Sequence, residues 1–120
     1  DLHPTYPASY TNKNLLVVAS SDSSGNLSYF SNFGKTSVDV AAPGSSIYST
    51  VLDNTYQSMS GTSMASPVVS GLAAEILANI PELSAEELKL KIVQHVRKDA
   101  KFEHKLTSGG LVDLKKSLEE

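Results

Sequence analysis

The stretch Thr62–Asn79, TSMASPVVSGLAAEILAN, decides how the rest of the sequence is interpreted. It predicts a helix with apolar residues on nearly every side, in which Glu75 carries the only charge. Pro67 lacks a backbone N–H and fits only near the first turn, so the helix should begin close to Ser63. Pro67 and Glu75 also interrupt the apolar run, which falls short of the roughly 18–20 residues that a bilayer span needs. The stretch therefore predicts a helix that is buried nearly all round.

Short apolar runs upstream of this helix predict strands. Leu15–Ala19 is a continuous apolar run with adjacent valines, which is typical of a strand covered on both faces of a parallel sheet. Turn signals separate further short strands, which we expect at Val38–Ala41, Ile47–Thr50 and Tyr56–Met59. Strands that precede a buried helix indicate the α/β class.

The C-terminal third of the sequence predicts two surface helices. Ser84 and Glu87 form the pattern of a capping box, which predicts a helix over Ser84–Lys98. Its apolar positions are Leu88, Ile92 and Val96, and the cations Lys89, Lys91 and Arg97 should face away from the core. A last short helix is expected after the glycine pair Gly109-Gly110, with Leu111, Leu114 and Leu118 on one face.

Length, charge and composition exclude several classes of protein. The chain has 120 residues, which allows one domain, and 40% of them are hydrophobic, which allows a real core. A net charge of −3 gives no electrostatic footprint for nucleic acid or an anionic membrane, so neither is expected as a partner. The absence of cysteine excludes disulfides, thiolate metal sites and cysteine nucleophiles. The opening on Asp1 without a methionine suggests the middle of a longer protein.

The chemistry is expected at the turn that enters the buried helix. A serine in the first helical turn has its Oγ beside unpaired backbone N–H groups and the positive end of the helix dipole, which together would stabilise an oxyanion. Ser63 could therefore be a nucleophile, or Ser63 or Thr62 could simply be the helix N-cap, the commonest role of such residues. The sequence lacks the second glycine of the α/β-hydrolase elbow, and no lysine follows Ser63 by three residues as in β-lactamases. The local pattern leaves both roles open.

Four stretches in order resemble the subtilisin-like serine proteases, the subtilases of peptidase family S8. The segment Gly61–Pro67, GTSMASP, resembles the nucleophile signature of that family. The other three stretches, and a glycine turn near the end of the chain, are Tyr6–Tyr10, Phe30–Gly34, Val38–Gly44 and Gly109–Asp113. The resemblance covers nearly the whole chain and implies a partial peptidase S8 catalytic domain over residues 1–120. It implies the C-terminal portion of a three-layer fold, in which a parallel sheet holds a buried nucleophile helix and surface helices flank it.

The resemblance implies roles for several residues. Ser63 matches the nucleophile, with its own backbone N–H as one oxyanion donor. Tyr6, Pro7 and Ala8 resemble the wall of the pocket for the substrate side chain before the scissile bond, and Thr62 lies next to the nucleophile on the substrate side. Val68 replaces the histidine that commonly follows the signature proline, and that histidine is not the catalytic base.

A cation site is also implied by the resemblance. Ala8, Tyr10 and Asp39 resemble positions that bind a cation in some members, through two backbone carbonyls and a carboxylate. No cofactor is needed for catalysis, and a structural Ca²⁺ or monovalent cation is the expected ligand. The loop 11–14 is longer than in those members, and one carboxylate holds a hard cation poorly. The alternative is that Asp39 is a buried carboxylate bonded to backbone amides.

The rest of the family's machinery is expected upstream of this chain. Its aspartate, histidine and oxyanion asparagine lie in earlier motifs, and His3, His95 and His104 do not match them. An unactivated serine is a poor nucleophile, so the chain alone should be inactive. The expected partners are polypeptide substrates, the upstream part of the same domain and copies of the chain itself. The resemblance favours a secreted or extracytoplasmic location. The alternatives are a non-catalytic subtilase-like binding or scaffold module and, more remotely, an esterase.

Overall fold

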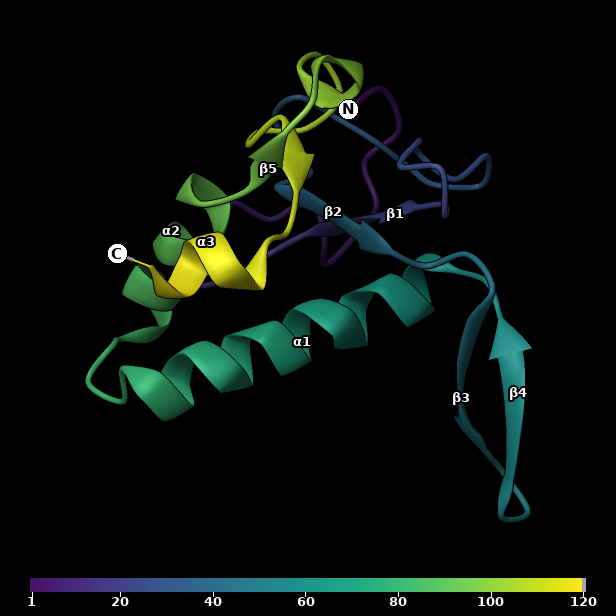
Figure 1. The fold of residues 1–120 in the computed structure, drawn as a ribbon. Helices are drawn as coiled ribbons and strands as arrows, with labels where there is room; N and C mark the ends of the chain where they lie inside the picture. The colour runs from purple at the N-terminus through teal and green to yellow at the C-terminus, as the bar shows by residue number, and fades with distance from the viewer. Residues whose placement is uncertain (120) are drawn as a thin grey trace.

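The computed structural model describes residues 1–119, and most of its four-stranded sheet is parallel (Figure 1). β1 (Val18–Ser21) pairs in parallel with β2 (Val40–Pro43). β2 pairs in parallel with β6 (Gly110–Leu111), which pairs antiparallel with β5 (Arg97–Lys98). The strand order is therefore β1-β2-β6-β5, and the predicted α/β class with a mostly parallel sheet is confirmed.

The first two strands begin and end later than the sequence predicted. β1 starts at Val18 rather than Leu15, and β2 starts at Val40 rather than Val38. Polar residues caused the error at the end of β1. Ser20 and Ser21 are typical of a turn that ends a strand, and yet they are 0% and 1% exposed. Their polar groups are satisfied inside the protein, which allows serines to continue a buried strand.

α1 (Thr62–Asn79) has the predicted bounds and lies along one face of the sheet (Figure 1). Ala65, Val69, Leu72 and Ile76 are buried and form a cluster with the β2 side chains that point to the same face. The opposite face of α1 is not covered by any of residues 1–119, and Val68 on it is 36% exposed. The prediction of a helix buried nearly all round is therefore wrong for this chain, which supplies cover for one side only.

The other face of the sheet is covered by the segment that follows β5. A second cluster joins Ala19, Ala41 and Leu111 of the three parallel strands to Phe102 and Leu106. Phe102 ends the short 3₁₀ helix η1 (Ala100–Phe102) and is fully buried. Both faces of the central strands are thus covered, as the apolar β1 run predicted.

α2 (Ala85–Gln94) begins with the predicted capping box. The Ser84 Oγ accepts from the Glu87 N–H at 3.3 Å, and the Glu87 carboxylate accepts from the Ser84 Oγ at 2.7 Å and the Ser84 N–H at 2.8 Å. These hydrogen bonds, the side-chain one foremost, lower the pKa of Glu87. The helix ends at Gln94 rather than Lys98, because Arg97 and Lys98 enter the sheet as β5.

α3 (Leu114–Leu118) is shorter than expected at its start. Leu111 lies in β6 and is buried in the sheet, so the expected helix face that included it is wrong. The Asp113 carboxylate caps α3 by accepting from the Lys116 N–H at 3.1 Å. None of the helices described in residues 1–119 has the length and hydropathy of a membrane span.

A β-hairpin projects from the body of the molecule just before α1 (Figure 1). β3 (Ile47–Val51) and β4 (Thr55–Met59) pair antiparallel, with Ile47 opposite Met59. Asp53 and Asn54 form its turn with φ of 63° and 54°, a left-handed conformation that these residue types tolerate. Tyr48 and Tyr56 stack on it at 5.7 Å and remain mostly exposed.

Candidate active site

Ser63 is the second residue of α1 and its side chain is exposed. The residue that caps α1 is Gly61, whose extended backbone precedes the helix, and no side chain caps it. Within residues 1–119 the structure records no hydrogen bond for the Ser63 or Thr62 hydroxyl. The alternative that Ser63 or Thr62 serves only as the N-cap is therefore wrong.

Backbone donors at the start of α1 lie beside the Ser63 hydroxyl. The Gly61 carbonyl accepts from the N–H groups of Met64 and Ala65 at 3.0 Å and 3.3 Å, so the first intrahelical bonds begin there. The N–H groups of Thr62 and Ser63 precede those bonds and have no intrahelical acceptor. Together with the helix dipole they favour negative charge next to the Ser63 Oγ.

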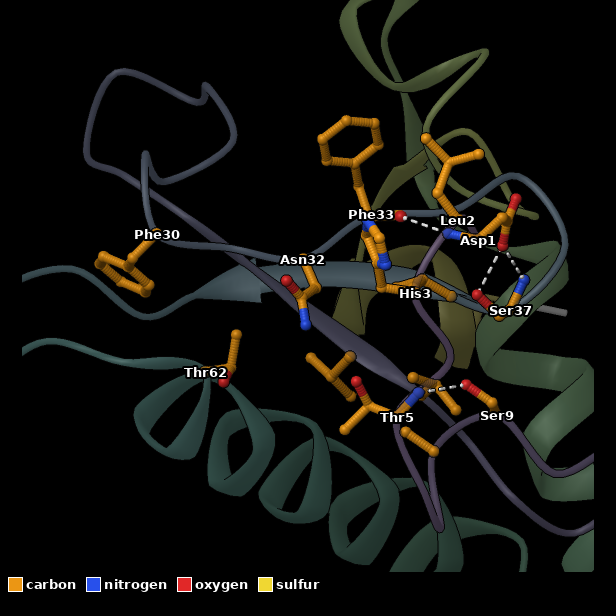
Figure 2. Close-up of a pocket in the computed structure, with 14 residues that line it drawn as sticks. Asp1, Leu2, His3, Thr5, Ser9, Phe30, Asn32, Phe33, Ser37 and Thr62 are labelled. Carbon is orange, nitrogen blue, oxygen red and sulfur yellow. Dashed lines mark hydrogen bonds between the residues drawn. The ribbon is translucent and has the colours of Figure 1, made fainter.

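Thr62 and Ala8 line the same open pocket, which has a volume of about 430 Å³. Figure 2 shows Thr62 on one side of it and Thr5 on the other, with the Asn32 amide pointing toward the space between them. The structure thus brings together two of the predicted substrate-binding residues. Thr5 is held by its own turn, because its N–H donates to the Ser9 Oγ at 2.9 Å.

Tyr6 and Pro7 do not line this pocket. Tyr6 is 63% exposed and its ring lies 4.9 Å from that of Tyr10, centroid to centroid. The turn is compact, since the Tyr10 N–H donates to the Pro7 carbonyl at 3.0 Å. In this chain the turn therefore presents Ala8 to the pocket and Tyr6 to solvent.

Sequence reasoning missed several pocket residues. Phe30 and Asn32 contribute side chains to the lining, and so does His3. The Phe30–Gly34 motif is a usable signal for the first two, because it is one of the stretches that resemble the family. Nothing local in the sequence indicated His3, which reaches the pocket only through the path of the N-terminal segment.

The surroundings of the three histidines bear on whether one of them could act as a base for Ser63. His95 follows α2, where its Nδ1 lies 2.7 Å from the Lys91 carbonyl oxygen. His104 is exposed in the turn after η1. Across residues 1–119 the structure records no hydrogen bond between Ser63 and His3, His95 or His104. That these histidines do not replace the family base stays a prediction.

Asp39 is paired with a lysine, which bears on the expected cation site. Its Oδ2 accepts from the Val17 N–H at 2.8 Å and lies 3.2 Å from the Lys89 Nζ. The same ammonium group donates to the Leu15 carbonyl. Lys89 was expected to face away from the core, which is wrong, because its side chain reaches back from α2 to the start of β1.

The residues at this position do not fit a bound metal ion. The carboxylate that a cation would need already has an ammonium group against it, and both side chains are largely buried, with exposed fractions of 14% and 20%. The arrangement favours the alternative in which Asp39 is satisfied inside the protein.

We predict that Lys89→Met destabilises the protein by about 1–3 kcal/mol. The substitution removes the cation beside the Asp39 carboxylate, which keeps the Val17 N–H, and it removes the side-chain donor to the Leu15 carbonyl. Denaturant unfolding measures the loss. Lys91→Met is the matched control on the same helix, and we expect it to change stability by less than about 0.5 kcal/mol. Equal effects of the two substitutions would contradict a structural role for the ion pair.

Comparison with known proteins bears directly on this site. A family model described as the subtilase family matches residues 1–109 of the chain. The chain belongs to the subtilase family. The match includes Ser63 and the whole of α1, together with the pocket residues Thr62, Ala8 and Asn32.

Named subtilases are similar to this chain over part of their length. Subtilisin DY from Bacillus licheniformis is 46% identical over 87 residues, which are 72% of this chain and 31% of that protein. Thermitase from Thermoactinomyces vulgaris is 57% identical over 70 residues, 58% of this chain and 24% of that protein. The chain thus spans less than a third of the length of these curated relatives.

Solved subtilase structures share the fold. A chain from a subtilase cytotoxin structure superposes with a TM-score of 0.83 at 29% identity. The match covers 94% of this chain and 41% of the cytotoxin chain. A cold-adapted subtilisin-like serine proteinase superposes with a TM-score of 0.72 at 35% identity. The match covers 84% of this chain and 38% of the proteinase chain. The subtilase sheet and α1 are therefore present here, and the larger part of those relatives lies outside the match.

Proposed function

We propose that this chain is the C-terminal part of the catalytic domain of a subtilisin-like serine endopeptidase, with Ser63 as its nucleophile. One observation carries the proposal. Ser63 lies exposed and uncapped at the start of α1, within the GTSMASP signature and beside backbone N–H groups that have no intrahelical acceptor.

The chemistry follows from that position. The Ser63 Oγ attacks the scissile carbonyl carbon, and a histidine from the upstream part of the domain takes the hydroxyl proton. The carbonyl oxygen becomes an oxyanion, which accepts a hydrogen bond from the Ser63 N–H and, from upstream, an asparagine amide. The histidine then gives its proton to the leaving amine, the peptide bond breaks, and water hydrolyses the acyl-enzyme on Ser63.

Pro67 changes the backbone hydrogen bonding of the first turn of α1. Proline has no N–H, so the carbonyl of Ser63, four residues earlier, receives no helical hydrogen bond from it. The first turn of α1 is therefore held by fewer intrahelical hydrogen bonds than the rest of the helix. The hydrogen bond from the Gly61 N–H to the Gly44 carbonyl, at 2.8 Å, compensates by holding the turn from outside.

The substrates of the intact protein are polypeptides in this proposal. Ala8 and Thr62 line the pocket that would take the side chain before the scissile bond, and Tyr6 and Pro7 shape the turn that presents Ala8. Asp39 is the partner of Lys89 in this proposal, and the chemistry at Ser63 needs no cofactor.

The upstream part of the domain is the essential partner. It would carry the family's aspartate and histidine, and within residues 1–119 no histidine is recorded in a hydrogen bond with Ser63. The isolated chain should therefore not hydrolyse peptides.

A secreted location is part of the proposal. A relative from Natrialba magadii, named as a halolysin-like extracellular serine protease, is 45% identical over 85 residues, 71% of this chain and 15% of that protein. Since this relative and the cold-adapted proteinase are both named as proteases, the non-catalytic scaffold module is not favoured.

We predict that a fluorophosphonate probe labels Ser63 in the full-length protein and spares Ser66. Both serines are exposed in the first turns of α1, but only Ser63 has the N–H groups of the helix start beside it. Mass spectrometry of the labelled peptide identifies the modified residue. Labelling that persists in the Ser63→Ala variant would sink the assignment.

A further inference from the structure

Three serine hydroxyls form a continuous chain of hydrogen bonds at the carboxyl end of β1. The Ser20 Oγ lies 2.8 Å from the Ser28 Oγ, which lies 2.7 Å from the Ser45 Oγ. Ser20 is 0% exposed and Ser28 is 4% exposed, so the bridge between them is inside the protein. Hydroxyls this deeply buried need partners, and each of these finds one in the next.

The hydroxyl chain ends beside Gly44, which touches the turn before Ser63. The Gly44 N–H donates to the Ser21 carbonyl at 3.0 Å, and the Gly44 carbonyl accepts from the Gly61 N–H at 2.8 Å. A Cβ on Gly44 would lie 2.3 Å from the Ser20 Oγ and 2.7 Å from the Gly61 carbonyl oxygen. The hydroxyl chain, Gly44 and the start of α1 are thus packed against one another with no spare space.

A second link runs in parallel with the first. The Ser46 N–H donates to the Ser60 Oγ at 2.8 Å. The segment Gly44–Ser46 therefore holds both Ser60 and Gly61, the two residues just before α1. On its other side the same segment is tied to β1 through Ser45, whose partner is Ser28.

We propose that Ser28 is a positioning residue for the nucleophile, an inference that rests on the proposed function. Its hydroxyl joins β1 to Gly44–Ser46, and that segment fixes the turn from which Ser63 projects. The Ser28 hydroxyl bonds to Ser20 and Ser45 and Ser28 does not line the pocket, so we expect it to act on Ser63 through the turn. Small displacements of a nucleophile reduce rate steeply, because the reacting atoms must be held close to the geometry of attack.

The test is Ser28→Ala in the full-length protease, assayed well below the unfolding temperature. We expect kcat to fall about ten-fold while KM stays within about two-fold, since the substrate pocket is untouched. The rate of fluorophosphonate labelling of Ser63 should fall by the same factor as kcat. A residue that only stabilises the fold would lower the unfolding temperature and leave both rates unchanged.

Ser117→Ala is the matched control. Ser117 is also 0% exposed, and its hydroxyl donates to the Asp113 carbonyl at 2.8 Å within the cap of α3, outside the hydroxyl chain. The control should lose stability without loss of kcat. If Ser28→Ala does not fold, Ser45→Ala breaks the same bridge at its partly exposed end and should show the same fall in kcat.

A double variant sharpens the result. If Ser28 and Ser45 act through one bridge, then Ser28→Ala with Ser45→Ala should be no slower than the slower single variant. An unchanged kcat in the single variants, with active wild-type enzyme, would overturn the positioning role alone. Wild-type protein whose Ser63 is neither labelled nor needed for hydrolysis would overturn the proposed function and the positioning role together.

Discussion

Replacing Ser63 with alanine should abolish peptide hydrolysis by the full-length protein and leave its stability nearly unchanged. The rate loss follows because no other group can form the acyl-enzyme, and its scale is the one known for nucleophile removal in subtilisin itself, about 10⁶-fold in kcat. The stability is spared because Ser63 is exposed, caps nothing, and gives way to the residue with the highest helix propensity.

The measurement pairs a peptide-hydrolysis assay with denaturant unfolding of the same preparations. Turnover that survives Ser63→Ala would move the chemistry to another residue. Loss of folding would instead restore the capping role that the structure argues against. Ser66→Ala, one helical turn further along the exposed side, is the control and should keep full activity.

The isolated chain of 120 residues should not persist as a stable monomer. α1 buries one face against the sheet and leaves Val68 and its neighbours uncovered. Large apolar side chains are also exposed elsewhere, at Leu2, Tyr29, Tyr48 and Leu52. At roughly 25 cal/mol per Å² of apolar surface, a few hundred Å² left in water forfeits several kcal/mol, which is comparable with the whole stability of a small domain.

Sedimentation and amide hydrogen exchange together decide this expectation. We expect association of the purified chain, or weak protection along residues 68–77. Supplying the upstream part of the domain as a second chain should restore a defined complex and strong protection. A monodisperse monomer with strong protection of α1 would mean that the chain covers its own core.

The sequence predicted the elements whose signals are local. The bounds of α1 follow from Gly61 and Pro67 and the change in composition at Thr62, and the cap of α2 follows from two residues three positions apart. Ser63 could be singled out because its whole motif lies within a few residues. Strand ends were predicted less well, because a buried serine is satisfied by partners that the local sequence does not show, such as Ser28 for Ser20.

Contacts between distant segments could not be predicted. Lys89 looked like a solvated cation on its helix, and only the fold brings it to Asp39 and to the Leu15 carbonyl, 74 positions away. Asn32 and Ala8 meet Thr62 at one pocket for the same reason. The burial of α1 was predicted wrongly. Apolar residues on every side of a helix indicate that all of its faces need to be buried, but they do not indicate which segment packs against each face.

The hairpin β3–β4 has a closed neck, and this has a consequence for engineering. Its two ends are clamped by the Gly44 carbonyl on the Gly61 N–H and by the Ser46 N–H on the Ser60 Oγ, while its turn at Asp53 and Asn54 lies far out in solvent. Exposed polar turns of this kind accept inserted sequence. A peptide tag or a small guest domain inserted between Asp53 and Asn54 would lie at the far end of the hairpin, away from the hydrogen bonds that hold the turn before Ser63. We therefore expect the length of an insertion at this turn to leave the position of Ser63 unchanged, because the hydrogen bonds at the base of the hairpin stay in place.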